Sequence, residues 1–422
     1  MTTQTRDRAL DLDYMRVIRL YLDTIAHWPN EKFGPKTMRT RILSIYHISI
    51  LTMLVAVVAA EILALFFVRG RMPTHGFIDL GQDYLSILIG CVMIPRLTLI
   101  LQEKYCSHIK TFVSKFHLLE HKHESGFAAK EYQKVNKICR IATMIILLEC
   151  LLGQMMFNVV PLYVNIQAGL FTSRDNRPQN VTFVHSLNYY FIIDQYNDAI
   201  GYGIASFINA YVSYMCGVEF CGIDLLIYIM VFHILGHFNI LVDKMRNFPR
   251  PVNFPDESQK YSERQYNEEA LKVLKNLIQH DQLIKEFMNN TSKTFSITLC
   301  ICLLFHQVSG CISLLEISPM TAEALTRYGP LILVLFNQLI QMSVIFELIS
   351  SKSNKLSDEV YALPWELMDA KNRKTMLLFL VNVQRPRGLK AGGLVSVGVL
   401  TMAQIIKNSV SYFLMLRTLG NF

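Results

Sequence analysis

Two histidines have the spacing of a metal-binding pair. His233 and His237 are four residues apart, so on a helix they would share one face. No nearby Asp or Cys motif completes a metal site, and we therefore expect packed or interfacial histidines. The sequence also has no Gly-rich phosphate loop, no Gly-x-Ser-x-Gly elbow and no His-Glu-x-x-His zinc helix. These patterns predict neither an enzyme nor a bound cofactor or metal.

Charged and amide residues inside long apolar segments are more informative, because each is costly there unless it faces protein or water. For any single one, we expect a structural hydrogen bond between helices. These residues are Glu61, Glu149, Glu219, Asp224, Asn337, Gln338, Gln341, Gln404, Lys407 and Asn408.

The last apolar segment forms a separate case. Gln404, Lys407, Asn408, Ser411 and Thr418 recur in it at near-helical spacing. The spacing leaves two interpretations open, a water-lined face or polar contacts between helices of one subunit.

The composition indicates a membrane protein. Of the 422 residues 52% are hydrophobic, and the mean hydropathy is +0.29. Apolar blocks reach the length of about 20 residues that a helix needs to cross a membrane. Helices are expected because they satisfy their own backbone hydrogen bonds. The blocks cover 42–69, 77–101, 138–165, 191–242, 294–317, 328–350 and 376–418.

Two of these blocks are unusual. We interpret 191–242 as one long helix whose outer end, with Asp194 and Asn197, lines a cavity. The block 376–418 is interrupted at Gln384–Gly388, so we expect a cytosolic half-helix before a final span at 391–418. The sequence thus predicts an all-α membrane protein with seven transmembrane helices.

The basic residues predict the orientation. Lys and Arg concentrate in 1–41, 103–140, 243–293 and 351–390, and are scarce in the other connections. The basic segments are therefore expected in the cytoplasm, with the N-terminus, and the C-terminus is expected outside. The net charge of +8 forms no basic stripe, so no nucleic-acid partner is expected.

This topology divides the chain into four regions. A cytoplasmic N-terminal segment (1–41) precedes six transmembrane helices (42–350), a cytoplasmic anchor segment (351–390), and a seventh helix with an extracellular C-terminus (391–422). Asn180 begins a glycosylation sequon in a loop assigned to the outside, and an unused sequon is the alternative.

The connection 243–293 has its own apolar pattern. Its leucines and isoleucine at 271, 274, 277, 278 and 283 would share one helix face. Such a face needs a partner, and we expect a cytoplasmic helical bundle formed with neighbouring loops or subunits.

The C-terminal third contains five short motifs, namely Phe305-His306-Gln307-Val308-Ser309-Gly310-Cys311, Leu363-Pro364-Trp365-Glu366, Gln384-Arg385-Pro386, Ala391-Gly392-Gly393 and Ser411-Tyr412-Phe413. In this combination the chain resembles the insect odorant receptor family, and the similarity extends over essentially its whole length. Tyr14-Met15-Arg16 with Trp28-Pro29 is similar to the pheromone-receptor branch of moths.

The resemblance implies a ligand-gated, non-selective cation channel subunit in the plasma membrane of olfactory sensory neurons. Its partner would be the odorant receptor co-receptor, in a heterotetramer whose seventh helices line a central pore. The family's constriction lies just after its Tyr-Phe pair, which places the gate at Met415, Thr418 and Leu419. Hydrophobic constrictions gate by dewetting.

The resemblance also implies a ligand pocket in the outer halves of the second, third, fourth and sixth spans. Asn337 or Gln154 could orient a polar head group, and ordinary packing between helices is the alternative role for each pocket residue. The expected lining is Tyr84, Leu88, Phe157, Ile193, Tyr196, Ile200, Tyr328 and Phe336.

The lining suits a volatile apolar ligand. The moth-type resemblance implies a long-chain fatty acetate, aldehyde or alcohol, and a general receptor for small plant volatiles is the alternative.

A G-protein-coupled receptor is the main competing class, because seven helices and an aromatic cavity suit it equally well. The basic residues argue against it, since those receptors have the N-terminus outside. The chain also lacks Asp/Glu-Arg-Tyr after the third span and Asn-Pro-x-x-Tyr in the seventh. A transporter is disfavoured because no inverted repeat is found.

Overall fold

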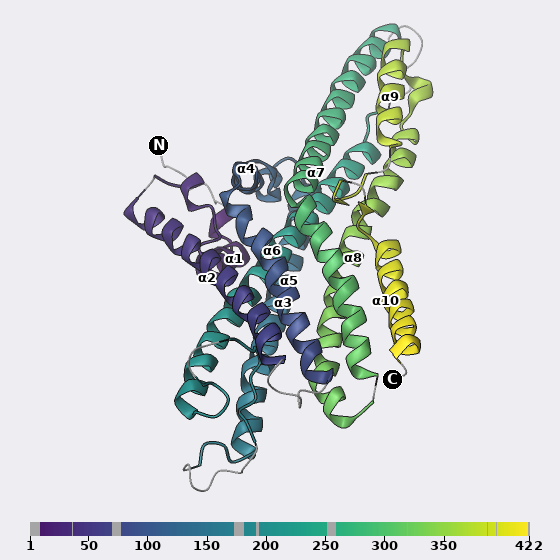
Figure 1. The fold of residues 1–422 in the computed structure, drawn as a ribbon. Coiled ribbons are helices and arrows are strands. Elements are labelled where there is room, and N and C mark those ends of the chain that lie inside the picture. Colours follow the sequence, from purple (N-terminus) through teal and green to yellow (C-terminus); the bar gives the residue numbers. More distant parts are fainter. Residues whose placement is uncertain are drawn as a thin grey trace.

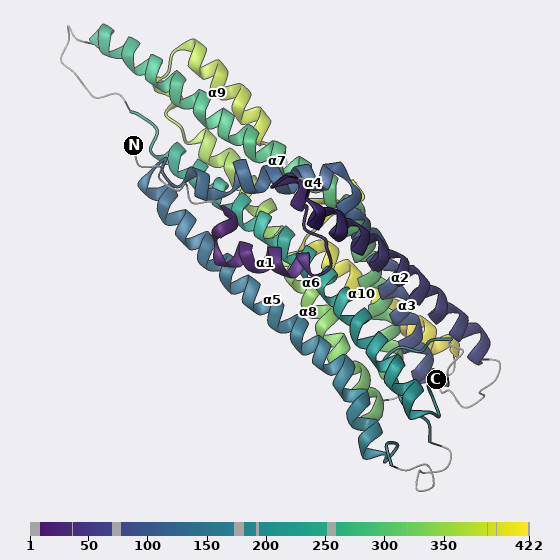
Figure 2. The ribbon, with the colours of Figure 1, turned by 90° about the vertical axis from the view of Figure 1, so that its left-hand side faces the viewer.

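The computed structural model describes residues 9–35, 37–69, 77–172, 181–190, 194–250, 259–318, 320–385, 387–393 and 395–420. Long helices run side by side in an elongated bundle (Figures 1 and 2). They are α1 (Asp13–Asp23), α2 (Met38–Arg69), α3 (Phe77–Leu97), α4 (Glu103–Thr111), α5 (Gly126–Gln167), α6 (Ala199–Arg246), α7 (Gln259–Ile317), α8 (Ala322–Tyr361), α9 (Ala370–Val383) and α10 (Val399–Gly420). Strands β1 (Lys390–Ala391) and β2 (Val395–Ser396) pair antiparallel. The predicted all-α fold is confirmed.

Six helices of the described part are long and apolar enough to cross a membrane. They correspond to the first six predicted blocks and comprise Met38–Phe67, Gly81–Leu101, Gly126–Gln167, Ala199–Arg246, Glu263–Ile317 and Leu331–Leu367. The seventh, α10, has 22 residues. At 1.5 Å per residue it extends about 33 Å, which is also enough to cross.

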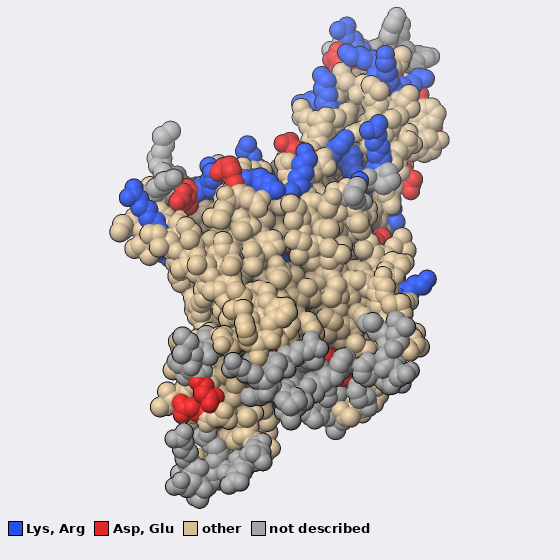
Figure 3. Space-filling model, in the orientation of Figure 1, with Lys and Arg blue, Asp and Glu red and all other residues tan. Residues whose placement is uncertain are grey.

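The two ends of the bundle differ in charge. Lys and Arg gather around α4 and α9, above a broad band of uncharged side chains (Figure 3). We call the end that carries α4 and α9 the basic end. The chain begins at this end, whereas the C-terminal end of α10 lies at the other (Figure 1).

Helix α6 confirms the prediction of one long helix, but it starts at Ala199 rather than at 191. Asp194 and Asp198 explain the difference. The Asp194 carboxylate accepts hydrogen bonds from the backbone N–H groups of Tyr196 and Asn197, which closes a turn. The Asp198 carboxylate accepts from the Gly201 N–H and caps the helix.

The predicted half-helix and helical bundle both occur at the basic end. Helix α9 lies along α7, which is one continuous helix through the predicted connection and span (Figure 1). On α7, Leu274 and Leu277 are buried in the same apolar cluster as Val360, Met376 and Phe379. The apolar face of 271–283 is therefore covered within one subunit.

His233 and His237 have separate hydrogen-bond partners. His233 Nε2 lies 3.2 Å from the Tyr14 hydroxyl, and His237 Nδ1 lies 3.0 Å from His280 Nε2. His237 Nε2 is 2.8 Å from the Phe116 carbonyl oxygen. Within the described residues, no group of three or more His, Cys, Asp or Glu side chains is placed to hold a metal ion.

A buried ion pair holds the connection between α9 and α10 against α7. The Arg387 guanidinium donates to both carboxylate oxygens of Asp281, at 2.5 and 2.9 Å. The chain then turns through Gly392 and Gly393, whose φ angles of +59° and +73° favour glycine. The Gly392 N–H donates to the Ser296 carbonyl oxygen, so the turn is held against α7.

We predict that Asp281→Asn strongly destabilises the protein, because it leaves Arg387 buried without its charged partner. Losing one partner of a buried pair costs about 3–5 kcal/mol. The thermal unfolding temperature of the detergent-solubilised protein measures the effect.

The double variant Asp281→Leu/Arg387→Met should recover most of this loss, because it leaves no unpaired charge. Glu268→Gln is the matched control, since it breaks the exposed α7 pair Arg264–Glu268. It should change stability by about 0.5 kcal/mol or less. Equal unfolding temperatures for Asp281→Asn and Glu268→Gln would contradict the assigned role of the buried pair.

Candidate functional site

A segment between α5 and α6 folds back over the end of the bundle opposite the basic end. We call residues 181–190 and 194–198 the cap segment. The buried Asn165 side chain on α5 donates to the Val184 carbonyl and accepts from the Val184 N–H, both at 2.9 Å. The Tyr190 N–H donates to the Ala60 carbonyl at 3.2 Å. The cap segment is thereby held to α5 and α2.

Helix α3 holds the cap segment at two further points. The Gln82 side-chain amide donates to the Ser186 carbonyl, and the Asn188 amide donates to Asp83 Oδ1 at 2.8 Å. The Ser186 hydroxyl donates to the Phe157 carbonyl on α5. Three helices therefore fix the position of this segment.

An apolar cluster lies beneath the cap segment. Leu187, Tyr189 and Val212 are its buried members. Six half-buried residues of α2, α5 and α6 pack against them, namely Met53, Val57, Ala60, Phe157, Ile208 and Cys216. We call these nine residues the capped cluster. An apolar site of this kind suits an apolar ligand.

His185 stabilises the inside of the cap segment. Its Nε2 lies 2.9 Å from the Gln195 carbonyl, so this nitrogen donates. Burial lowers the pKa of His185 more than this hydrogen bond raises it. The ring is therefore neutral at neutral pH and adds no charge beside the apolar cluster.

The structure brings some of the predicted ligand residues to this region. Phe157 belongs to the capped cluster. Tyr196 stacks edge-on against His185, and its hydroxyl donates to Asn188 Oδ1 at 3.3 Å. Leu88 packs against a second buried cluster, which contains Val58 and Met93.

The two predicted polar anchors are held by other side chains. The Gln154 amide donates to the Ser213 carbonyl at 2.7 Å. The Asn337 amide donates to Glu149 Oε1 at 2.9 Å, and Gln341 donates to the same oxygen at 2.7 Å. These contacts match the interhelical role that the sequence predicts for such residues.

The remaining predicted residues differ in exposure. Tyr328 is buried, Phe336 is half-buried, and Tyr84 and Ile200 are 43% and 74% exposed. Neither Tyr84 nor Ile200 belongs to the capped cluster. Ile193 and the sequon residue Asn180 lie outside the described residues.

Sequence reasoning missed Leu187, Tyr189 and Met53. The first two lie in a connection that the scarcity of Lys and Arg assigns to the outside, with no other role predicted for it. Their signal was the close spacing of Leu187, Tyr189 and Tyr190 inside a loop, interrupted by Asn188. Met53 gave no signal, because an apolar residue of α2 looks the same whether it faces lipid or a site.

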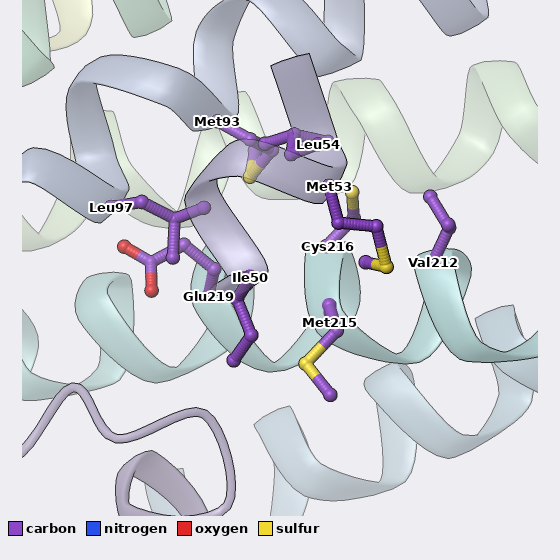
Figure 4. Close-up of a pocket in the computed structure, with 9 residues that line it drawn as sticks. All are labelled: Ile50, Met53, Leu54, Met93, Leu97, Val212, Met215, Cys216 and Glu219. Atoms are coloured by element: carbon purple, nitrogen blue, oxygen red, sulfur yellow. The ribbon is translucent and has the colours of Figure 1, made fainter. Parts of the chain in front are cut away.

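A small cavity lies between α2, α3 and α6 (Figure 4). Its volume is about 10 Å³, which is room for one water molecule. Eight apolar or sulfur-containing side chains and one carboxyl group line it. They are Ile50, Met53, Leu54, Met93, Leu97, Val212, Met215, Cys216 and Glu219.

Helix α10 packs at the edge of the bundle (Figure 1). Its buried residues Ile405 and Ser409 face the other helices, and the Gln307 amide of α7 donates to the Ser409 hydroxyl at 3.1 Å. Gly310 permits this approach, since an added Cβ would lie 3.0 Å from Ser409 Oγ. Gln307 and Gly310 both belong to a motif that suggested the family.

Another face of α10 is uncovered in the single subunit. Gln404, Ser411, Met415 and Thr418 are exposed, and Asn408 is half-buried. Their spacing of three and four residues places them on one helix face. The Gln404 amide donates to Asn408 Oδ1 at 2.7 Å, within this face. The side chain of Leu419 lies outside the described part.

A bundle of membrane-spanning helices defines a multi-pass membrane protein. Comparison with known proteins gives the family. Residues 99–410 match the family model described as 7tm Odorant receptor, so the chain belongs to the insect odorant receptor family. Its members are receptors and channels rather than enzymes, which confirms that no enzyme activity is expected.

Individual relatives agree with this assignment. The chain is 22% identical to Odorant receptor 67c of Drosophila melanogaster over 347 residues. The aligned region covers 80% of this chain and 81% of that relative. The fold is similar to that of the insect olfactory receptor OR5 from Machilis hrabei in complex with eugenol, with a TM-score of 0.75 and 12% identity over 98% of this chain and 100% of that chain. A second structure of OR5 from Machilis hrabei gives a TM-score of 0.74 and 13% identity, over 96% of this chain and 97% of that chain.

We predict that Asn165→Leu loosens the cap segment, because it removes both hydrogen bonds to Val184. Two hydrogen bonds of about 0.5–1.5 kcal/mol each correspond to about tenfold or more in the opening equilibrium. Hydrogen–deuterium exchange of the solubilised protein should therefore be about tenfold faster at the Val184 amide.

The control is Gln167→Leu, two residues further along α5, where the amide donates to the Tyr163 hydroxyl of the same helix and to no other group among the described residues. It should leave exchange in 181–190 unchanged. If both variants exchange at the wild-type rate, Asn165 does not hold the cap segment.

Proposed function

We propose that this protein is an odorant-binding subunit of a ligand-gated, non-selective cation channel that assembles with the odorant receptor co-receptor. The observation that carries the proposal is the uncovered face of α10. Gln404, Asn408 and Ser411 would be costly against lipid, but they suit a water-filled pore completed by other subunits. A heterotetramer would supply those subunits, in the plasma membrane of olfactory sensory neurons.

The proposed orientation places the basic end in the cytoplasm. The concentration of Lys and Arg around α4 and α9 supports it, by the positive-inside rule (Figure 3). The cap segment would then lie outside, where an odorant arrives, and the sequon at Asn180 would lie in the same connection.

The proposed ligand is a long-chain fatty acetate, aldehyde or alcohol. The capped cluster supports an apolar ligand, because eight of its nine residues are apolar or sulfur-containing and the ninth, Tyr189, is aromatic. Each buried methylene contributes about 0.8 kcal/mol before ordering costs, so affinity should rise with chain length until the site is full. A receptor for small plant volatiles is the second candidate for ligand class.

We predict an odorant-evoked cation current when the chain is expressed with the co-receptor, and none from the chain alone. The current should persist when G-protein cycling is blocked inside the cell, because an ionotropic channel needs no second messenger. Current recordings with a panel of fatty acetates, aldehydes and alcohols test both points.

A panel of small plant volatiles serves as the comparison. Strong responses to these compounds alone would contradict the fatty-ligand assignment. Loss of the current under the G-protein block would contradict the channel assignment and favour a metabotropic receptor.

A second prediction concerns the proposed gate. Met415→Ser should wet the constriction and raise the ligand-independent current, because hydrophobic gates close by dewetting. Whole-cell leak current, normalised to surface expression, measures the change.

Val410→Ser is the matched control, since Val410 is 41% exposed but does not lie on the face of Gln404 and Met415. It should leave the leak current unchanged. Equal leak in the two variants would show that Met415 is not at the gate.

A further inference from the structure

Glu219 is a buried carboxyl group with unused hydrogen-bonding capacity. Its side chain is 1% exposed, and neither carboxylate oxygen has a hydrogen-bond partner among the described residues. His27 Nδ1 lies 3.3 Å from Glu219 Oε2, but without hydrogen-bond geometry. An unpaired polar group in such a place is costly, so a polar guest is expected beside it.

The cavity provides the space for that guest. Glu219 lies at one end beside Leu97, and Met53, Met215 and Cys216 lie toward the other end (Figure 4). A volume of about 10 Å³ accommodates one water molecule or one hydroxyl group of similar size. An acetyl group is too large for it without rearrangement of the walls.

The cavity adjoins the capped cluster. Met53, Val212 and Cys216 line the cavity and also belong to that cluster. Methionine is flexible and readily adapts to a neighbour, so a movement of Met53 would join the cavity to the capped cluster. A ligand chain that displaces side chains of the capped cluster would then extend its end to Glu219.

We propose that the cavity is a head-group subsite in which Glu219 accepts a hydrogen bond from the terminal hydroxyl of an aliphatic ligand. The inference rests on the proposed function and names the ligand class more narrowly, as a long-chain primary alcohol. A carboxyl group accepts hydrogen bonds and, when protonated, also donates one; of the three proposed head groups only the alcohol can both donate and accept, so it matches Glu219 in either state. Gln154 and Asn337 are already bonded to Ser213 and Glu149, whereas Glu219 is not.

The test compares head groups at equal chain length. Cells expressing the co-receptor with each variant are exposed to dodecanol, tetradecanol and hexadecanol and to the matching acetates and aldehydes. Glu219→Met removes the carboxyl group at similar length, and should raise the half-maximal concentration for the alcohols about tenfold or more. The shifts for acetates and aldehydes should be much smaller. Glu219→Gln keeps a hydrogen-bond acceptor and should restore the alcohol response.

Glu131→Met is the control for loss of a buried carboxyl group elsewhere in the bundle. Glu131 accepts a hydrogen bond from Asn239 and does not line the cavity. This variant should leave the ranking of the three head groups as in the wild type.

A second measurement needs no substitution at Glu219. Cys216 lines the cavity and Cys91 is exposed, so alkylation of the two thiols can be compared by mass spectrometry of the wild-type protein. Tetradecanol should slow alkylation of Cys216 but not of Cys91, and tetradecane, which lacks the hydroxyl, should protect Cys216 less. Equal protection by the two compounds would overturn the proposal.

The results separate the two levels of inference. No current with any compound, in wild type with co-receptor, would count against the proposed function. Normal currents with equal shifts for all three head groups in Glu219→Met, or with no shift, would overturn the Glu219 subsite alone and leave a bound water as the cavity's occupant.

Discussion

The ion pair between Arg96 and Asp224 is the interaction on which the centre of the bundle depends. Arg96 is 1% exposed, and its Nη2 lies 2.9 Å from Asp224 Oδ1. The Gln338 amide donates to the other Asp224 oxygen at 2.8 Å, and the Arg96 guanidinium also donates to the Phe220 carbonyl. Either charge alone in hydrocarbon would be very costly. The pair therefore fixes α3, α6 and α8 relative to one another, with α6 as the most enclosed of the six spans.

Much of the fold could be predicted because hydrocarbon imposes strong conditions on a sequence. The apolar blocks located the spans, and the charged stretches located their ends. The continuity of α7 from 259 to 317 could not be read in the same way. Its first half is charged on one side and packs against α9, whereas its second half is apolar. Because the two halves differ in hydropathy, the sequence pattern indicates two separate elements although the helix is continuous. The start of α6 was missed because Asp194 and Asp198 act through turn and cap hydrogen bonds, which hydropathy does not report.

The site was less predictable than the fold. Polar residues inside spans indicated interior surfaces, and Glu149, Asn337, Gln338 and Gln341 all have interhelical hydrogen bonds. Spacing alone could not separate them from Glu219, which lies five residues before Asp224 on the same helix and has no such partner. The difference depends on which residues of α2, α3 and α8 face each position. The cap segment was hidden for another reason, since its packing depends on Asn165, Gln82 and Asp83, far away in sequence.

The ligand region and the proposed pore helix lie on different sides of the bundle, so their relation depends on the helices that touch both. Helix α8 is one of these. Its Gln338 bonds to Asp224 on α6, and its Asn337 and Gln341 bond to Glu149 on α5. Toward its other end, the Glu347 carboxylate accepts from the Val399 N–H at the start of α10, at 3.3 Å.

Through these contacts α8 connects the helices around the ligand region to the start of the proposed pore helix α10. Gly398 precedes α10 where an added Cβ would lie 2.5 Å from Glu347 Oε2, so the start of α10 and α8 are closely apposed. A rearrangement of α5 or α6 around a ligand must either break the hydrogen bonds to Glu149 and Asp224 or carry α8 with it. Breaking them leaves the buried Asp224 and the half-buried Glu149 without these partners, which is costly in a membrane interior. Movement of α8 as a unit is therefore the lower-energy response. Such a movement displaces Glu347, whose carboxylate accepts the hydrogen bond from the Val399 N–H at the start of α10.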